Sequence, residues 1–100
     1  MAKRLIWTRQ AQQDRVDIFE YWNNRNKSKV YSRKLNAIFR DHLRLILKYP
    51  EIGHETDIEN VRCRTVRDYQ IIYMKAGDSI VLLSIWDSRQ NPSTIIKRLK

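Results

Sequence analysis

Residues 61–86 read VRCRTVRDYQIIYMKAGDSIVLLSIW, and this stretch predicts three consecutive β-strands. Residues 61–66 alternate apolar or small side chains with Arg62 and Arg64, as a strand with one wet face does. Residues 69–75 and 79–86 are rich in Tyr, Ile, Val and Leu, which favour strands. The connections at 67–68 and 76–78 are so short that neighbouring strands are expected to be antiparallel.

The residues that precede this stretch predict a short strand and two helices. Residues 3–8 hold a short apolar run, and the Thr8 hydroxyl is placed to cap a helix from residue 9 to about residue 24. The apolar face of this helix consists of Ala11, Ile18, Phe19 and Trp22. Its acidic side chains are expected largely on the opposite, solvent-facing side: Asp14, Asp17 and Glu20. The polar run 23–26 predicts its end, because Asn readily adopts the left-handed backbone conformation.

A second helix is predicted from a cap at Ser28 to about Tyr49, where Pro50 and Gly53 stop it. Its predicted buried stripe is broad enough to contact both the first helix and a sheet: Tyr31, Leu35, Ile38, Phe39, His42, Leu43, Ile46 and Leu47. Residues 51–60 contain four acidic side chains and no Lys or Arg, and they predict a loop set against nearby basic groups.

These elements give an α+β fold in the order β-α-α-β-β-β. We expect one domain over residues 1–100, because two cores in a chain of this length would each be too small to be stable. The helical hairpin is predicted to cover one face of a mainly antiparallel four-stranded sheet. The arginines of the first long strand are expected on the opposite, uncovered face.

The net charge of +9 points to an anionic partner. Residues 1–50 carry 12 basic and 4 acidic side chains, whereas residues 51–100 carry 8 and 7. The excess is densest at five positions near the predicted connection between the helices: Arg25, Lys27, Lys29, Arg33 and Lys34. Such a cluster fits a binding surface, and it also fits a helix face that is simply solvated.

Several classes of site are not predicted. The single cysteine, Cys63, excludes an internal disulfide and is expected to be a small buried side chain. No His, Cys and acidic residues have metal-ligand spacing, and two separated glycines cannot form a phosphate-binding loop, so neither metal nor cofactor is predicted. No membrane span or signal peptide is recognisable. We therefore expect a cytoplasmic protein without a membrane partner or a small-molecule substrate.

The ordered set of local patterns resembles the RelE/ParE superfamily of toxins, which includes plasmid stabilisation proteins. An aromatic strand end and a helix with Ala, acidic and Ile/Tyr positions are similar to the family's opening: Trp7, Thr8, Ala11, Asp14, Ile18 and Tyr21. The helix-ending pattern is matched by Leu47, Pro50 and Gly53. Residues 64–73 resemble its "R…Y-x-I-x-Y" strand pair, and residues 85–92 resemble "I-x-H-x-R-x-x-P" with Asp87 in place of His.

The resemblance implies a toxin that halts growth when free and is neutralised by a cognate antitoxin, often through extended acidic segments. A basic surface and a free sheet edge suit such a partner. RelE-like members cut messenger RNA on the ribosome, whereas ParE-like members poison DNA gyrase by binding. Either target is compatible with the resemblance.

A metal-independent ribonuclease needs cations to stabilise the crowded phosphate, together with a base and an acid. The candidate catalytic cations are Arg62, Arg64, Arg67 and Arg89, since guanidinium groups clamp phosphates well. They are poor proton carriers because they stay charged near neutrality. Asp87 is a candidate base, although neighbouring cations weaken a carboxylate in that role and a simple bridge to Arg89 is an alternative.

The rest of a nuclease set is missing from the sequence. Gln70 follows Tyr69 where RelE-like nucleases often have Arg, and residues 92–100 contain neither Tyr nor His. His42 falls on the apolar stripe of the second helix, and His54 falls in the acidic loop. We therefore rank a ParE-like gyrase poison above a RelE-like mRNA endonuclease. A basic nucleic-acid-binding module, with aromatic and cationic residues interleaved, and an inactive antitoxin-binding homologue stay as alternatives.

Overall fold

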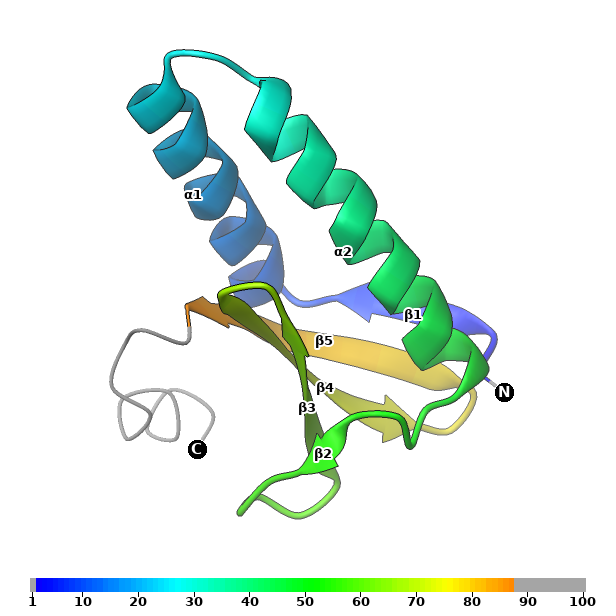
Figure 1. Cartoon of the computed structure of the whole chain (residues 1–100). Helices are drawn as coiled ribbons and strands as arrows, with labels where there is room; N and C mark the ends of the chain where they lie inside the picture. The colour runs from blue at the N-terminus through cyan, green and yellow to red at the C-terminus, as the bar shows by residue number, and fades with distance from the viewer. Residues whose placement is uncertain (1, 88–100) are drawn as a thin grey trace.

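The computed structural model describes residues 2–87, which form two helices and five strands (Figure 1). In chain order the elements are β1 (Arg4–Trp7), α1 (Arg9–Asn26), α2 (Val30–Lys48), β2 (His54–Glu55), β3 (Val61–Val66), β4 (Tyr69–Ala76) and β5 (Ser79–Asp87). This is the predicted α+β order with one short strand added inside the acidic segment. From the sequence, residues 93–100 are expected to form one or two final helical turns, and they lie outside the described residues.

The strands form one sheet in the order β1-β5-β4-β3-β2. The three long strands are antiparallel neighbours, as their short connections predict. β1 lies beside β5 and runs parallel to it, with Arg4 opposite Ser79 and Trp7 opposite Leu82. The prediction of four strands was one too few, because β2 is only two residues long and has no apolar alternation that would reveal it.

The helical hairpin begins at a capped helix and turns through a left-handed residue. The Thr8 hydroxyl accepts a hydrogen bond from the amide of Ala11 (3.1 Å) and donates one to the carbonyl of Leu82 (2.7 Å), so one side chain starts α1 and fixes it to β5. α1 runs two residues beyond the predicted end, and Lys27, not an Asn, adopts the left-handed conformation (φ 50°). The predicted cap at Ser28 was wrong by one position, because Lys29 is the N-cap residue of α2 and makes no capping bond with its side chain. The Ser28 hydroxyl does accept a hydrogen bond from the amide of Val30 (3.2 Å).

The main core lies between the hairpin and one face of the sheet. From α2 it takes Leu35, Phe39, Leu43 and Ile46, all within the predicted stripe. From the sheet it takes Val66, Tyr69, Ile71, Tyr73, Ile80, Leu82 and Ile85. Side chains alternate between faces along a strand, so a second buried cluster of Val61, Ile72 and Trp86 belongs to the opposite face. Neither described helix is long and apolar enough to cross a lipid bilayer.

Asp14 is the one acidic residue of α1 whose predicted position on the solvent side was wrong. It is buried (9% exposed) and not on the solvent side. One carboxylate oxygen accepts hydrogen bonds from the Ser84 hydroxyl (2.6 Å) and the Ile85 amide (3.0 Å), and the other accepts from Gln10 (2.8 Å). The register between β4 and β5 shifts at this point, which brings two successive groups of β5 to the same oxygen. Asp14 thereby joins α1 to the centre of the sheet.

We expect Asp14→Ala to lower the free energy of unfolding by about 2–4 kcal/mol, because it leaves a buried hydroxyl and a buried amide without their acceptor. Urea denaturation followed by circular dichroism measures this loss. Asp17→Ala is the matched control, since Asp17 lies one turn along on α1 and accepts an exposed bond from Gln13. Its expected effect is within about 0.5 kcal/mol. Equal losses in the two variants would contradict the structural role assigned to Asp14.

Candidate functional site

The β3 arginines lie on the face of the sheet that the helices cover. Arg62 is paired in register with Tyr73, and Arg64 with Ile71, and both partners belong to the core beneath the hairpin. The prediction that these arginines stud the opposite, open face was therefore wrong. The predicted alternation along 61–66 is present. However, the side with Val61 and Cys63 packs in the second apolar cluster, and the arginines border the main core.

Arg62 holds the loop that follows α2. Its guanidinium donates to the carbonyl of Gly53 (2.9 Å) and, at 3.4 Å, to that of Glu51. It also lies 3.5 Å from the carboxylate of Glu55 on β2, so the acidic segment is set against a basic side chain as expected. The guanidinium of Arg62 is thus occupied by backbone and carboxylate oxygens of its own chain.

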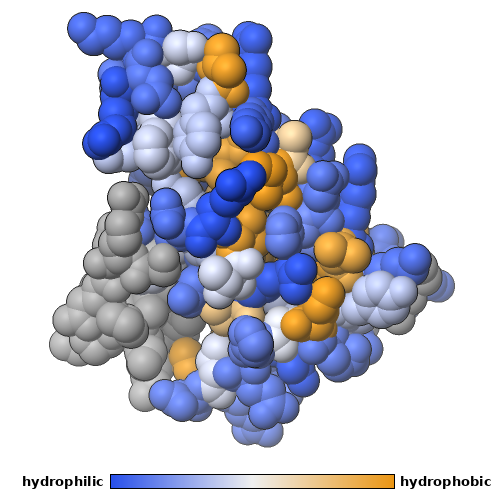
Figure 2. Space-filling model, viewed as in Figure 1, coloured by the Kyte–Doolittle hydropathy of each residue, from blue (hydrophilic) through white to orange (hydrophobic). Residues whose placement is uncertain are grey.

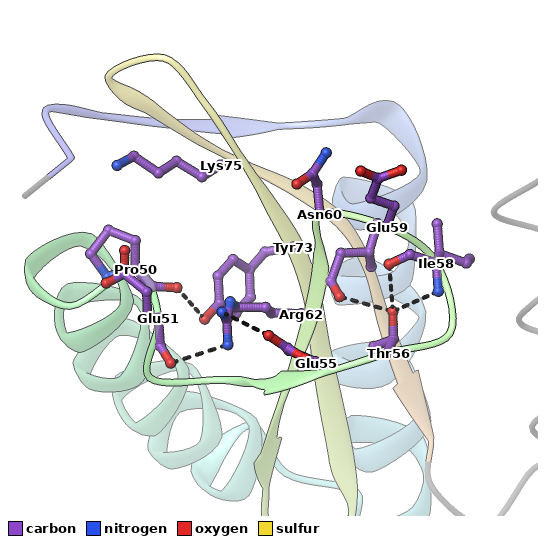
Figure 3. Close-up of a pocket in the computed structure, with 11 residues that line it drawn as sticks. Pro50, Glu51, Glu55, Thr56, Ile58, Glu59, Asn60, Arg62, Tyr73 and Lys75 are labelled. Carbon is purple, nitrogen blue, oxygen red and sulfur yellow. Dashed lines mark hydrogen bonds and ion pairs between the residues drawn. The ribbon is translucent and has the colours of Figure 1, made fainter.

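Tyr73 completes this arrangement from β4. Its hydroxyl donates to the carbonyl of Pro50 (2.8 Å) and accepts from the amide of Gly53 (2.9 Å). Burial raises the pKa of Tyr73 above its usual value, so the hydroxyl keeps its proton. A cavity of about 360 Å³ opens beside these contacts, and Figure 3 shows Glu55 turned toward Arg62 while Lys75 and Glu59 extend away from them. Carboxylates and cations are mixed along its wall, and its lining favours no single ligand charge.

Arg64 lies beside His42 of α2. Its Nε donates to Nδ1 of His42 at 2.8 Å, so the imidazole accepts at that nitrogen and is neutral. The pKa of His42 is lowered from 6.5, first because the ring is partly buried and then because Arg64 is positively charged, while Asp41 opposes this effect. The sequence identified His42 as a core or boundary residue, which it is, but gave no sign of this contact across 22 positions.

The remaining candidates are spread over the sheet. Arg67 is exposed in the β3–β4 turn, where it adopts a left-handed backbone conformation (φ 58°). It lies five positions after Arg62 of β3, which amounts to about 16 Å in an extended strand. Asp87 ends β5 opposite Tyr69, near the turn that holds Arg67. Arg89 lies outside the described residues. Within residues 2–87, the structure therefore pairs Arg62 and Arg64 with separate structural partners.

Cys63 and Gln70 meet on neighbouring strands. The Cys63 thiol donates to the side-chain carbonyl of Gln70 at 2.9 Å, and burial raises the pKa of the thiol, which keeps it protonated. Cys63 is half-buried and not fully buried as expected. Across residues 2–87 no three His, Cys, Asp or Glu side chains are grouped in a way that would hold a metal ion.

Comparison with known proteins assigns this arrangement to a family. Residues 5–92 match the model of the ParE toxin of the type II toxin–antitoxin system parDE. A solved structure described as the chromosomal ParDE TA system from P. aeruginosa is similar in fold, with a TM-score of 0.72 at 18% sequence identity. The alignment covers 84% of this chain and 94% of that one. No curated protein matches the chain.

The fold, a helical hairpin on a mixed five-stranded sheet, is similar to that of the ParDE structure, and the family match confirms the expected resemblance to the RelE/ParE superfamily. Because the family model spans most of the sequence, the chain belongs to the ParE toxin family of type II toxin–antitoxin systems.

The contact between His42 and Arg64 predicts a pH-dependent stability. The folded chain binds a proton at His42 only below the pH at which the unfolded chain does, because the pKa of His42 is lowered in the folded state. The free energy of unfolding should therefore decrease as the pH falls through 6.5 toward the lowered pKa. Urea midpoints measured in steps between about pH 8 and pH 5 follow this decrease.

His42→Gln is the informative variant, because its side-chain carbonyl can still accept from Arg64 but does not titrate. We expect its urea midpoint to depend less on pH than that of the original chain. His54→Gln is the control, since His54 is exposed on β2 and takes no part in this contact. If His42→Gln keeps the full pH dependence, the assignment to His42 is wrong.

The contacts of Tyr73 predict a strict requirement for glycine at position 53. A Cβ at Gly53 would lie 2.6 Å from the Tyr73 hydroxyl, 2.9 Å from Cε1 of the same ring and 3.0 Å from the carbonyl of Cys63. Gly53→Ala should therefore lower the free energy of unfolding by about 1–3 kcal/mol. Tyr73→Phe removes the closest atom. The substitution at position 53 should therefore cost less in the Tyr73→Phe background, and a double-mutant cycle with urea denaturation measures the difference. Additive losses would show that the clash lies elsewhere.

Proposed function

We propose that this chain is a toxin that halts growth by binding and poisoning DNA gyrase, and that a cognate antitoxin neutralises it. Membership of the ParE toxin family supports the toxin role. The observation that carries the choice of target is the placement of the β3 arginines. Arg62 donates a hydrogen bond to the loop after α2, and Arg64 donates one to His42. Neither guanidinium is therefore presented as part of a common phosphate site.

A poison that acts by binding needs surface complementarity and no proton-transfer machinery. The described residues fit this requirement, because their buried titratable contacts have structural roles. Tyr73 and Cys63 are both held in their protonated forms, and Asp14 is engaged by three donors. A catalytic group would instead be aimed at open space with a pKa matched to its task.

An antitoxin would have both an edge and an apolar strip to bind. β2 pairs only with Arg62 and Cys63, so within the described part of the chain residues 64–66 of β3 have a neighbouring strand on one side alone. Leu45 on α2 and Tyr49, which directly follows α2, are exposed (38% and 52%). Figure 2 shows apolar side chains exposed near the middle of the face that α2 crosses, surrounded by hydrophilic ones. A segment that adds a strand or helix here would bury apolar area as it folds.

A RelE-like mRNA endonuclease is the second candidate, and one contact favours it. His42 is a neutral imidazole beside the guanidinium of Arg64, and a neutral imidazole next to a cation is a combination that can take up a proton near a phosphate. The alternative would require RNA to reach the boundary between α2 and β3 and to displace the bond between the two side chains.

The gyrase proposal predicts that induced expression arrests growth and activates the DNA-damage response. With purified gyrase, ATP and plasmid, the protein should increase the amount of linearised DNA, and the increase should require gyrase. A reaction with gyrase, ATP and plasmid but without the protein is the negative control. Mapping of mRNA 5′ ends after induction should show no new ribosome-dependent cuts.

Ribosome-dependent cuts without an effect on gyrase would contradict the proposal and support the endonuclease. Two variants then test the site. Arg64→Ala with Arg89→Ala removes candidate phosphate-binding cations, whereas His42→Gln changes the partner of Arg64 and keeps its charge. In an endonuclease that uses these cations the first variant should lose cleavage by at least tenfold, about the effect of one charge-assisted contact.

A further inference from the structure

The end of the helical hairpin is a protruding cationic surface. The tip cluster consists of five exposed side chains around the α1–α2 connection: Arg25, Lys27, Lys29, Arg33 and Lys34. Figure 1 shows this end of the hairpin extending beyond the sheet. The sequence from residue 21 to residue 40 contains no Asp or Glu. Within residues 2–87, no ion pair engages a member of the tip cluster, since the ion pairs found involve Arg44 and Arg62.

The charge of the tip comes from its side chains and not from helix ends. The C-terminus of α1 and the N-terminus of α2 lie together here, and their opposite partial charges of about half an elementary charge largely cancel. Arg25 contacts the ring of Trp22 (5.9 Å) and the hydroxyl of Tyr21 (3.2 Å), which steadies it without neutralising it. The tip cluster therefore keeps its full positive charge in solvent.

The molecule is also electrically polarised. The acidic segment 51–60 includes β2, which Figure 1 places at the other end of the molecule from the hairpin connection. A polyanion therefore attracts the hairpin end and repels the acidic end, so the hairpin tip faces it on approach. Charge that was only scattered over a solvated surface would not produce this separation.

We propose that the tip cluster binds the phosphodiester backbone of a duplex nucleic acid. The phosphate oxygens of a nucleic acid accept hydrogen bonds and attract cations. The tip supplies cations together with the exposed side-chain amides of Asn24 and Asn26. An acidic protein segment is less well matched, because durable protein interfaces have an apolar centre. Of the large apolar residues that are exposed in the described part of the chain, two belong to this end of the hairpin, Val30 (73%) and Tyr21 (44%). Two such residues are few for the apolar centre of a protein interface. Contacts to phosphates carry no base sequence information, so the binding is expected to be independent of sequence.

The test uses the full chain and fluorescent duplexes of about 20 base pairs, one of DNA and one of RNA, with fluorescence anisotropy read at several salt concentrations. The tip variant carries Lys27→Gln, Lys29→Gln, Arg33→Gln and Lys34→Gln. If each of these four cations neutralises one phosphate, the affinity of the original chain should fall about 150-fold between 50 and 200 mM salt through them alone. The slope of log K against log salt should be shallower by about 3 to 4 in the tip variant.

The control variant removes the same charge from exposed positions away from the tip: Lys3→Gln, Arg4→Gln, Arg9→Gln and Lys75→Gln. It should keep the salt slope to within about one unit. Binding of either duplex that depends on the tip supports the proposal, and the stronger of the two identifies the form of nucleic acid.

Three outcomes would overturn the proposal. They are the absence of binding to both duplexes, equal losses in the tip and control variants, and tip-dependent binding of a labelled poly-glutamate peptide as tight as that of the duplexes. The last result would assign the tip to an acidic protein instead. Thermal unfolding of both variants checks that they fold. Nucleic-acid binding is measured without gyrase, so its failure is distinguishable from failure of the gyrase proposal.

Discussion

The rest of the structure depends on the joint between α1 and β5. The Thr8 hydroxyl donates to the carbonyl of Leu82, and the Asp14 carboxylate accepts from the hydroxyl of Ser84 and the amide of Ile85. The first two turns of the helix are therefore held to one short stretch of β5. A buried carboxylate is costly unless donors surround it, and here they do. With α1 fixed, the hairpin presents its apolar face to the sheet and the main core closes beneath it.

This position of the hairpin determines what the β3 arginines can do. Because α2 crosses the edge of the sheet beside β3, Arg64 meets His42, and the loop after α2 returns over Arg62. The guanidinium groups hold α2 and the loop that follows it against β3. Among residues 2–87, the densest group of exposed cations lies instead at the far end of the hairpin.

The helices and long strands could be predicted from the sequence, but the contacts between the helical hairpin and the sheet could not. The alternation of 61–66, the broad stripe of α2 and the Thr8 cap each follow from local periodicity or capping chemistry, and each is present in the structure. The burial of Asp14 depends on a register shift between β4 and β5. The covered position of Arg62 and Arg64 depends on which face of the sheet the hairpin packs against. Both features depend on contacts between residues that are far apart in the sequence. A pattern of alternating residues is the same whichever face of the sheet is covered.

The parallel pairing of β1 with β5 has a consequence for synthesis of the chain. Arg4 lies opposite Ser79, so β1 can pair only after synthesis of β5, which comes more than seventy residues later. Until β5 leaves the ribosome, Thr8 lacks the carbonyl of Leu82, Asp14 lacks its donors Ser84 and Ile85, and the hairpin has no complete sheet to cover. Contacts so distant in sequence form slowly. A ribosome-bound fragment that lacks β5 therefore cannot complete the sheet or the contacts that fix α1 to it.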